Sequence, residues 1–274
     1  MDTFRLEQLV DIVKRAGDII RNVHNVADIK EKEGPANFVT RYDSAVQEFL
    51  VQEFSQALPS AHFLAEEDGL TATDPYDGYV FVIDPIDGTT NFICDFHCSG
   101  ICAGLALNGE MIMGAVYNPF REEMFYAEKG RGAFLNGRHL QIKNLPIEKG
   151  VTDCGACAPY PSLRDFSLAI CRDLSFHTMD IRELGSAAIA LCYVACGRLI
   201  LYASPKLCAW DYAAAQIIIE EAGGVVCGYD GEPLDLRTGV TVLASTPKGK
   251  DEFLALTKHT REHYRSPGFL VKNF

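Results

Sequence analysis

The sequence predicts a layered protein of helices and strands, of the α/β or α+β class. Three features of its 274 residues predict this class: helical periodicity at both ends, short apolar runs between turn residues in the middle, and alternating helical and strand patterns after Gly150. No low-complexity linker or internal repeat divides the chain. We therefore expect one domain, residues 1–274, made of two interlocked halves, about 1–146 (α+β) and about 147–274 (α/β).

Two helices and a series of strands are predicted in the first half. Residues 4–23 place apolar side chains three and four positions apart, as one face of a helix does. A second helix is predicted over residues 43–57, with Thr40 as its N-cap. Apolar runs between turn residues predict strands at 62–65, 79–83, 100–107, 111–117, 124–127, 132–135 and 139–142. The last two flank Asn136-Gly137, which predicts a hairpin.

The second half alternates between the two kinds of pattern. Helices are predicted at 162–173, 186–196, 211–222 and 249–264. Strands are predicted near Val151, at 199–203, near Val225 and near Val240. The break between the halves is expected near residues 144–150.

Charge and composition exclude several classes of function. The net charge is −12 and no run of basic residues interrupts the acidity, so we expect no nucleic-acid ligand and no anionic membrane surface. The longest stretches without a charged residue have 14 residues, too few to span a bilayer. The N-terminus lacks the basic and apolar regions of a secretory signal, so we expect a cytoplasmic protein.

The ten cysteines are expected to be reduced and mostly buried, because a chain of this length builds its core without disulfides. Cys154 and Cys157 have metal-site spacing, but neither a second such pair nor a histidine cluster accompanies them. We interpret them as the end of a strand.

The most informative segment is Asp84-Pro85-Ile86-Asp87-Gly88-Thr89-Thr90-Asn91-Phe92, which directly follows a predicted strand. Pro85 forces a turn that brings Asp87 back beside Asp84, and Gly88 allows a ligand close to the backbone. The threonines and the amides that follow offer donors to an anion. The segment therefore suits a hard cation next to a phosphate, although aspartates in a polar turn also cap their own backbone.

Carboxylates in similar settings occur at Glu66-Glu67, after a predicted strand, and at Asp211, in the first turn of a predicted helix. Taken with Gly185-Ser186-Ala187-Ala188 and Trp210-Asp211-Tyr212-Ala213-Ala214, they resemble the inositol monophosphatase family of magnesium-dependent, lithium-sensitive phosphatases. The resemblance extends from Lys32 to Gly224. It implies a five-layer αβαβα sandwich of the type shared with fructose-1,6-bisphosphatases, a homodimer, and hydrolysis of inositol monophosphate by metal-activated water.

The resemblance also implies the site residues. One Mg²⁺ would be held by Glu66, Asp84 and the Ile86 carbonyl, and a second by Asp84, Asp87 and Asp211, with a third ion near Glu66. Glu66 and Thr89 would activate the attacking water, with Asp84 as the bridging catalytic carboxylate. The residues expected to contact the small phosphorylated substrate are Asp87, Gly88, Thr89, Thr90, Gly185, Ser186, Ala187, Ser204 and Asp211.

Several of these positions have a second interpretation. Lys32, Asp43 and Glu67 are expected as accessory residues near the metals, but Asp43 also suits the first turn of a helix capped by Thr40. Ser186 equally suits a helix N-cap. Next to Asp211, Trp210 is expected as a buried anchor and Cys208 as a core residue.

Ser204 departs from the family pattern. Inositol-specific relatives carry a glutamate at this position, seven residues before Asp211, and a serine cannot accept the same pair of hydrogen bonds. A broader sugar-phosphate, fructose-1,6-bisphosphate or NADP phosphatase therefore stays open, and Lys206 beside it would suit a second phosphate. A regulatory interaction protein that retains a phosphatase site, and a magnesium-binding protein with degraded catalysis, are the alternatives of other classes.

Overall fold

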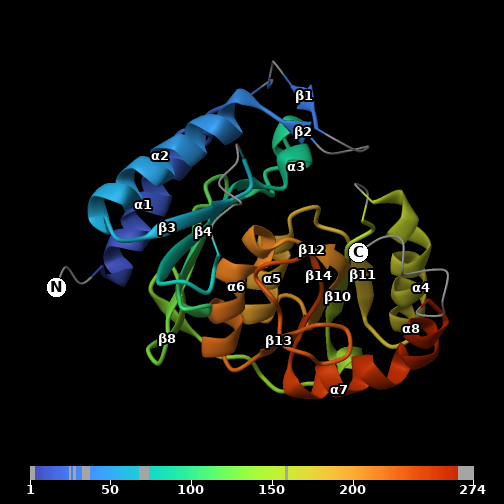
Figure 1. The fold of residues 1–274 in the computed structure, drawn as a ribbon. Helices are drawn as coiled ribbons and strands as arrows, with labels where there is room; N and C mark the ends of the chain where they lie inside the picture. The colour runs from blue at the N-terminus through green and yellow to red at the C-terminus, as the bar shows by residue number, and fades with distance from the viewer. Residues whose placement is uncertain are drawn as a thin grey trace.

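The computed structural model describes residues 4–24, 26, 29–32, 38–67, 74–157 and 160–264. Its elements stack in the order helices, sheet, helices, sheet, helices, which is the predicted αβαβα sandwich (Figure 1). Helices α1 (Leu6–Asp18) and α2 (Arg41–Ala57) form the first layer, and α5 (Ala187–Ala195) and α6 (Ala209–Glu221) lie between the sheets. The outer layer consists of α4 (Arg164–Ser175), α7 (Pro247–Leu256) and α8 (Lys258–Tyr264).

Thr40 starts α2 as predicted. Its hydroxyl accepts a hydrogen bond from the Tyr42 amide at 3.1 Å, and the Asp43 carboxylate accepts one from the Thr40 amide at 2.8 Å. Helix α1 is shorter than predicted: it ends at Asp18, and the Ile19 amide bonds back three residues to Ala16 rather than four. The apolar spacing continues past this end because residues 19–23 stay against the same core in a tighter turn.

The first sheet has seven strands in the order β3-β4-β5-β6-β7-β8-β9, antiparallel except for the β3–β4 pair. Their bounds are β3 (His62–Ala65), β4 (Tyr79–Asp87), β5 (Gly100–Leu107), β6 (Glu110–Asn118), β7 (Glu123–Glu128), β8 (Gly132–Leu135) and β9 (Arg138–Leu140). The predicted hairpin forms at Asn136-Gly137, both in the left-handed region with φ of 49° and 81°.

Strand β4 is longer than predicted. Pairing with β5 continues from Asp84 opposite Cys102 to Asp87 opposite Gly100, so the β4 side carries one extra residue, a bulge. Pro85, which has no amide proton to give to the ladder, lies within this bulge. The segment is therefore a bulged strand end followed by the short helix α3 (Thr89–Ile93).

The second sheet has the order β11-β10-β12-β14-β13. Strands β10 (Val151–Cys154), β12 (Leu201–Leu207), β13 (Val225–Cys227) and β14 (Val240–Ser245) correspond to predictions, whereas β11 (Asp180–Arg182) was not predicted. Two of the three β11 residues are charged and exposed, so no apolar run marks the strand. The short strands β1 (Lys30–Glu31) and β2 (Phe38–Val39) were also missed, as were two 3₁₀ turns, η1 (Ile147–Lys149) and η2 (Pro161–Leu163).

The final predicted helix is two helices, α7 and α8, because the chain bends at Thr257. The Thr257 hydroxyl donates to the Phe253 carbonyl at 2.7 Å, inside the last turn of α7. Helix α7 begins at Pro247, earlier than predicted, where Thr246 caps it by accepting from the Gly249 amide at 2.8 Å.

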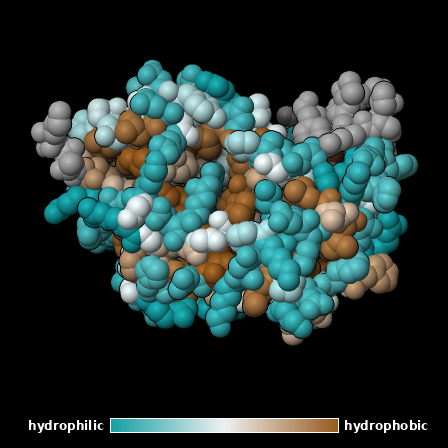
Figure 2. Space-filling view, turned by 90° about the horizontal axis from the view of Figure 1, so that it is seen from below, coloured by the Kyte–Doolittle hydropathy of each residue, from teal (hydrophilic) through white to brown (hydrophobic). Residues whose placement is uncertain are grey.

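The ten cysteines are free, as predicted, but only five are buried and Cys94 is exposed. Cys154 is the last residue of β10, in agreement with its interpretation as a strand end. The face in Figure 2 is covered mainly by hydrophilic residues, with hydrophobic ones showing between them. Among the helices that the structure describes, none combines the length and apolar character needed to cross a membrane.

Candidate active site

Three aspartates from two elements meet where strand β4 ends. Asp84 and Asp87 come from the bulge of β4, and Asp211 comes from the first turn of α6. One carboxylate oxygen of each lies within 4.8 Å of the others. Asp84 and Asp87 are buried, and Asp211 is partly exposed.

Each aspartate also bonds to nearby backbone. Asp84 accepts from the Ile86 amide at 3.0 Å and Asp211 from the Cys208 amide at 2.7 Å. Asp87 reaches across to the start of α5, where it accepts from the amides of Ala187 at 3.2 Å and Ala188 at 2.8 Å. The interpretation of Asp84 and Asp87 as caps of their own turn is therefore right for Asp84, whereas Asp87 bonds to the start of α5 instead, and both roles coexist with the convergence of the carboxylates.

The electrostatics of this group call for a cation. Burial raises the pKa of Asp84 and Asp211 well above the ordinary value, and the neighbouring carboxylates raise them further. Burial also raises the pKa of Asp87 to about 6, against the lowering effect of its donors at the start of α5. A hard divalent cation would remove this repulsion, and carboxylate oxygens are the ligands that Mg²⁺ prefers. The donor set therefore fits Mg²⁺.

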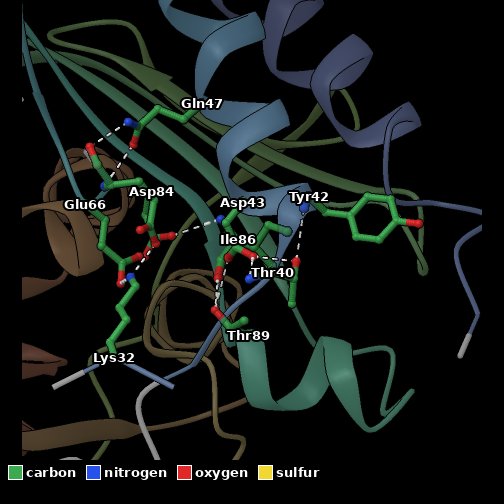
Figure 3. Close-up of polar contacts among 10 residues, drawn as sticks. Lys32, Thr40, Tyr42, Asp43, Gln47, Glu66, Asp84, Ile86 and Thr89 are labelled. Atoms are coloured by element: carbon green, nitrogen blue, oxygen red, sulfur yellow. Dashed lines mark hydrogen bonds and ion pairs between the residues drawn. The ribbon is translucent and has the colours of Figure 1, made fainter. Parts of the chain in front are cut away.

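Glu66 lies beside the three aspartates and holds Lys32. It follows β3, and its amide donates to the Ile83 carbonyl of β4 at 3.2 Å. Lys32, just after β1, places its ammonium 3.0 Å from Glu66 Oε1 and also contacts the Glu67 carboxylate (Figure 3). Gln47 of α2 holds the Glu67 backbone by two hydrogen bonds, of 2.6 and 3.0 Å. The structure thus brings together Lys32, Glu66 and Glu67, three of the residues expected near the metals.

Asp43 lies in the first turn of α2, as one of its two interpretations predicted, and it also contacts Thr89. Its side chain is fully buried, and one oxygen accepts from the amide and the hydroxyl of Thr40. Its other oxygen lies 3.3 Å from the Thr89 hydroxyl, which also lies 3.1 Å from the Ile86 carbonyl (Figure 3). Thr89 therefore donates its proton toward acceptors of the protein and keeps its lone pairs for another donor, such as a water.

Gly88 makes the close approach of two segments possible. Its φ is 85°, and a Cβ there would lie 3.0 Å from the Gly185 carbonyl oxygen and 3.0 Å from Ser186 Cβ. Asn91 of α3 fixes the same contact, because it donates to the carbonyls of Cys98 and Leu184, both at 2.7 Å. Gly185, Ser186 and Ala187 are thereby held against the end of β4.

Ser186 caps α5, accepting from the Ile189 amide at 3.4 Å, while its hydroxyl donates to Asp87. The N-cap interpretation is therefore confirmed. The Ala187 amide is turned toward Asp87 as well. The start of α5 consequently orients a predicted metal ligand.

A cavity of about 540 Å³ opens beside the carboxylates. Predicted residues that line it include Glu66, Asp87, Thr90, Ser204 and Asp211. Ser204 is 3% exposed, and its hydroxyl donates to the Lys206 carbonyl at 3.3 Å.

Two predictions about this wall are wrong. Trp210 is partly exposed and lines the cavity instead of being a buried anchor, and Cys208 lines it too, at the N-cap of α6, instead of lying in the core. Both lie just before Asp211 at the N-terminus of α6, which borders the cavity.

Several residues of the cavity wall were missed, and those with polar or ionisable side chains include Asp153, Tyr160 and Glu183. Asp153 is 1% exposed and accepts from the Leu184 amide at 2.9 Å, and burial raises its pKa to about 7. Glu183 accepts from the Ala156 amide at 2.9 Å. The one available signal was a buried-strand position occupied by an acid, Asp153 in Val151–Cys154.

The chain is similar to known proteins along almost its whole length. Residues 3–263 match the model of the inositol monophosphatase family. Inositol monophosphatase 1 of Sus scrofa is 33% identical over 91% of this chain and 92% of its own. Inositol monophosphatase 2 of Solanum lycopersicum is 34% identical over 91% and 97%. Among solved structures, an inositol monophosphatase of Thermotoga maritima is similar with a TM-score of 0.85 and 29% identity, over 95% of this chain and 99% of that one.

Proposed function

Since the chain belongs to the inositol monophosphatase family and is a phosphatase, we propose that it hydrolyses inositol monophosphate to inositol and phosphate in the presence of Mg²⁺. The observation that carries the proposal is the convergence of Asp84, Asp87 and Asp211 within 4.8 Å beside a cavity large enough for a phosphorylated sugar or polyol. Buried carboxylates at such distances disfavour their own ionisation unless a cation accompanies them.

The residues that would hold Mg²⁺ are Glu66, Asp84, Asp87, Asp211 and the carbonyl of Ile86, for two or three ions. When bound, the metal supplies Lewis-acid stabilisation of the charge on the phosphoryl oxygens and lowers the pKa of water. Phosphoryl transfer needs little else than alignment and charge stabilisation. The remaining tasks belong to the protein's own side chains and amides.

Thr89 is the residue whose hydrogen bonding suits activation of the attacking water. Its hydroxyl is directed by Asp43 and the Ile86 carbonyl, so its lone pairs are free to accept a proton of that water. Glu66, held by Lys32, supplies a carboxylate as the second acceptor. We assign the amides after Gly88 and the hydroxyl of Thr90 to the phosphate, and the start of α5 at Gly185–Ala187 to the substrate alcohol.

A different phosphorylated substrate is the second candidate, and Ser204 favours it. Its short side chain is buried and bonded to the Lys206 carbonyl, so position 204 offers no carboxylate to bind inositol hydroxyls. Fructose 1,6-bisphosphate and NADP share the required phosphomonoester. The interaction-protein alternative rests on no feature of the described surface and is tested below.

The test is phosphate release with Mg²⁺ from inositol 1-phosphate, fructose 1,6-bisphosphate, NADP and an adenosine 3′,5′-bisphosphate, each with and without lithium. Asp84→Asn should lower kcat/KM at least about a hundredfold, because metal clamping contributes several kcal/mol to the transition state. The exposed Asp251→Asn is the matched control and should stay near wild type.

Substantial Mg²⁺-dependent release by Asp84→Asn would contradict the assigned site. A preference for another compound would keep the chemistry and replace the substrate. No release from any compound, with Mg²⁺ binding intact, would favour the interaction protein. Lithium sensitivity, a homodimer and a cytoplasmic location stay predictions.

A further inference from the structure

Two lysines line the cavity, and their charges are used differently. Lys32 pairs with Glu66 and Glu67 at the carboxylate end. Lys206, near the end of β12, lies instead 4.2 Å from the centroid of the Tyr160 ring. Among the residues that the structure describes, no carboxylate oxygen lies within 4.0 Å of the Lys206 ammonium. Lys206 is thus a cation that lines the cavity and has no carboxylate partner in the described part of the chain.

The position of Lys206 follows from the backbone around it. The pairing of β12 with β14 shifts register between Ser204 and Leu207, so Pro205 and Lys206 form an irregular segment at the cavity wall. The lysine stem passes close to Gly239, where an added Cβ would lie only 3.1 Å from Lys206 Cε. Stem and ring together hold the ammonium at the wall, which lowers the entropy cost of binding an anion there.

Tyr160 connects this cation to the carboxylate end. Burial raises the pKa of its hydroxyl to about 12, and Asp211 and Glu66 contribute to the rise. The phenol is therefore neutral. Tyr160, Lys206, Glu66 and Asp211 line the same cavity, so a ligand whose reacting phosphate binds at the carboxylates has room to extend toward Lys206.

The acidic residues of the cavity wall restrict what else such a ligand carries. Asp153 and Glu183 each accept a backbone amide, from Leu184 and Ala156, and leave their second oxygens for other donors. These oxygens suit hydroxyl groups and repel an anion. Lys206 is therefore the place on this wall for negative charge, and hydroxyls belong beside Asp153 and Glu183.

From this arrangement we propose a second anion subsite at Lys206 and Tyr160, which makes a sugar or polyol bisphosphate the preferred substrate class. The proposal rests on the proposed phosphatase function and deepens it. One phosphate is the reacting group at the three aspartates, and the other binds the Lys206 ammonium through charge-assisted hydrogen bonds. The serine at position 204 keeps a carboxylate away from that second phosphate.

Binding tests the subsite without turnover. We would measure the Kd of fructose 1,6-bisphosphate, fructose 1-phosphate and fructose 6-phosphate by calorimetry with Ca²⁺ in place of Mg²⁺, since Ca²⁺ also takes carboxylate oxygens but in looser geometry. The bisphosphate should bind at least about tenfold more tightly than either monophosphate, the worth of one charge-assisted contact. Lys206→Met should remove most of that preference, and Lys206→Arg should keep it.

Two further variants control the result. Lys143→Met removes an exposed lysine outside the cavity and should leave all three Kd values unchanged. Tyr160→Leu should weaken bisphosphate binding by about threefold, through loss of the ring under the ammonium. With Mg²⁺, the Lys206→Met effect on bisphosphate hydrolysis should fall on KM, with kcat within about twofold of wild type.

The outcomes separate this proposal from the proposed function. Equal wild-type affinity for bisphosphate and monophosphates would overturn the subsite, as would an equal loss for all three in Lys206→Met. A preference for adenosine 2′,5′-bisphosphate over 2′-AMP without one among the fructose phosphates would overturn the sugar or polyol class. A persistent bisphosphate preference without phosphate release from any compound would refute the phosphatase proposal alone.

Discussion

Asp153 is a carboxylate that the fold holds in an unfavourable place. It is 1% exposed in β10 and accepts a hydrogen bond from the Leu184 amide at 2.9 Å, but burial dominates and raises its pKa to about 7. The nearby Glu183 raises it further. Near neutral pH the side chain is therefore shared between a protonated and an ionised form, and the stability of the protein depends on which form is present.

Asp153→Asn should remove this pH dependence. The unfolded aspartate releases its proton near pH 4 and the folded one near pH 7, so the free energy of unfolding falls as pH rises through this interval. Asparagine keeps an acceptor for Leu184 without a charge. The free energy of unfolding of the variant, minus that of wild type, should rise by on the order of 3 kcal/mol from pH 4 to pH 8, as measured by urea denaturation. For the exposed Asp77→Asn this difference should not change with pH, and an equal rise in both variants would contradict the assignment.

At the scale of elements, the site depends on the contact between the turn after β4 and the start of α5. Gly88 lets the two backbones approach, and Asn91 ties them together. The same contact aims Asp87 at the amides of Ala187 and Ala188. Any substitution that pushes these two segments apart should therefore displace Asp87, a predicted metal ligand.

Gly88→Ala should therefore destabilise the protein by more than the strain of its left-handed backbone conformation alone. Gly137→Ala is the matched control, because its φ of 81° is close to the 85° of Gly88 while no atom of the described residues lies within 4 Å of its added Cβ. The control should lower the free energy of unfolding by about 1 kcal/mol and keep full activity. Gly88→Ala should lower the free energy of unfolding by about 1–3 kcal/mol more, and it should lower kcat/KM at least about tenfold. Thermal unfolding and phosphate release measure both, and equal effects at the two glycines would disprove the close-contact argument.

At the scale of the whole molecule, one hydrophobic core joins the two halves. It contains Val80 and Val82 of the first sheet, Tyr202 and Val242 of the second, and most of α5 and α6 between them. Ile218 of α6 is fully buried within it. The two halves proposed from the sequence therefore share their interior, and we expect them to unfold together.

Ile218→Ala should lower the free energy of unfolding of the whole chain by about 2–5 kcal/mol, through lost burial and the cavity left behind. Calorimetry should show one transition for wild type and variant alike. The exposed Leu168→Ala should change stability by less than about 0.5 kcal/mol. Two separate transitions, with only one shifted by Ile218→Ala, would show that the halves are independent.

Structural features that depend on only a few consecutive residues were predictable from the sequence. Thr40 and Ser186 cap their helices, and Asn136-Gly137 forms its hairpin, because turn and cap chemistry acts over two to four residues. Element ends and the charged strand β11 were not predictable, because neighbours distant in the sequence decide where pairing stops.

The candidate site divides in the same way. Asp84 and Asp87 lie in one segment whose composition already indicated a cation and a phosphate, whereas Asp211 joined them through family resemblance. The cavity wall could not be foreseen, because contacts such as Ala156 with Glu183 and Asp153 with Leu184 join two separate segments.

The sequence by itself determined the class of fold and the pairing of Asp84 with Asp87 in a segment suited to a cation, because periodicity, capping and the spacing of these two carboxylates are local properties of the chain. Only the tertiary structure decided which lysine pairs with carboxylates and which lies over a tyrosine ring, that Asp153 is buried with a raised pKa, and that Trp210 and Tyr160 line the cavity. Burial and long-range contact set these properties, and both arise when segments distant in the sequence pack together.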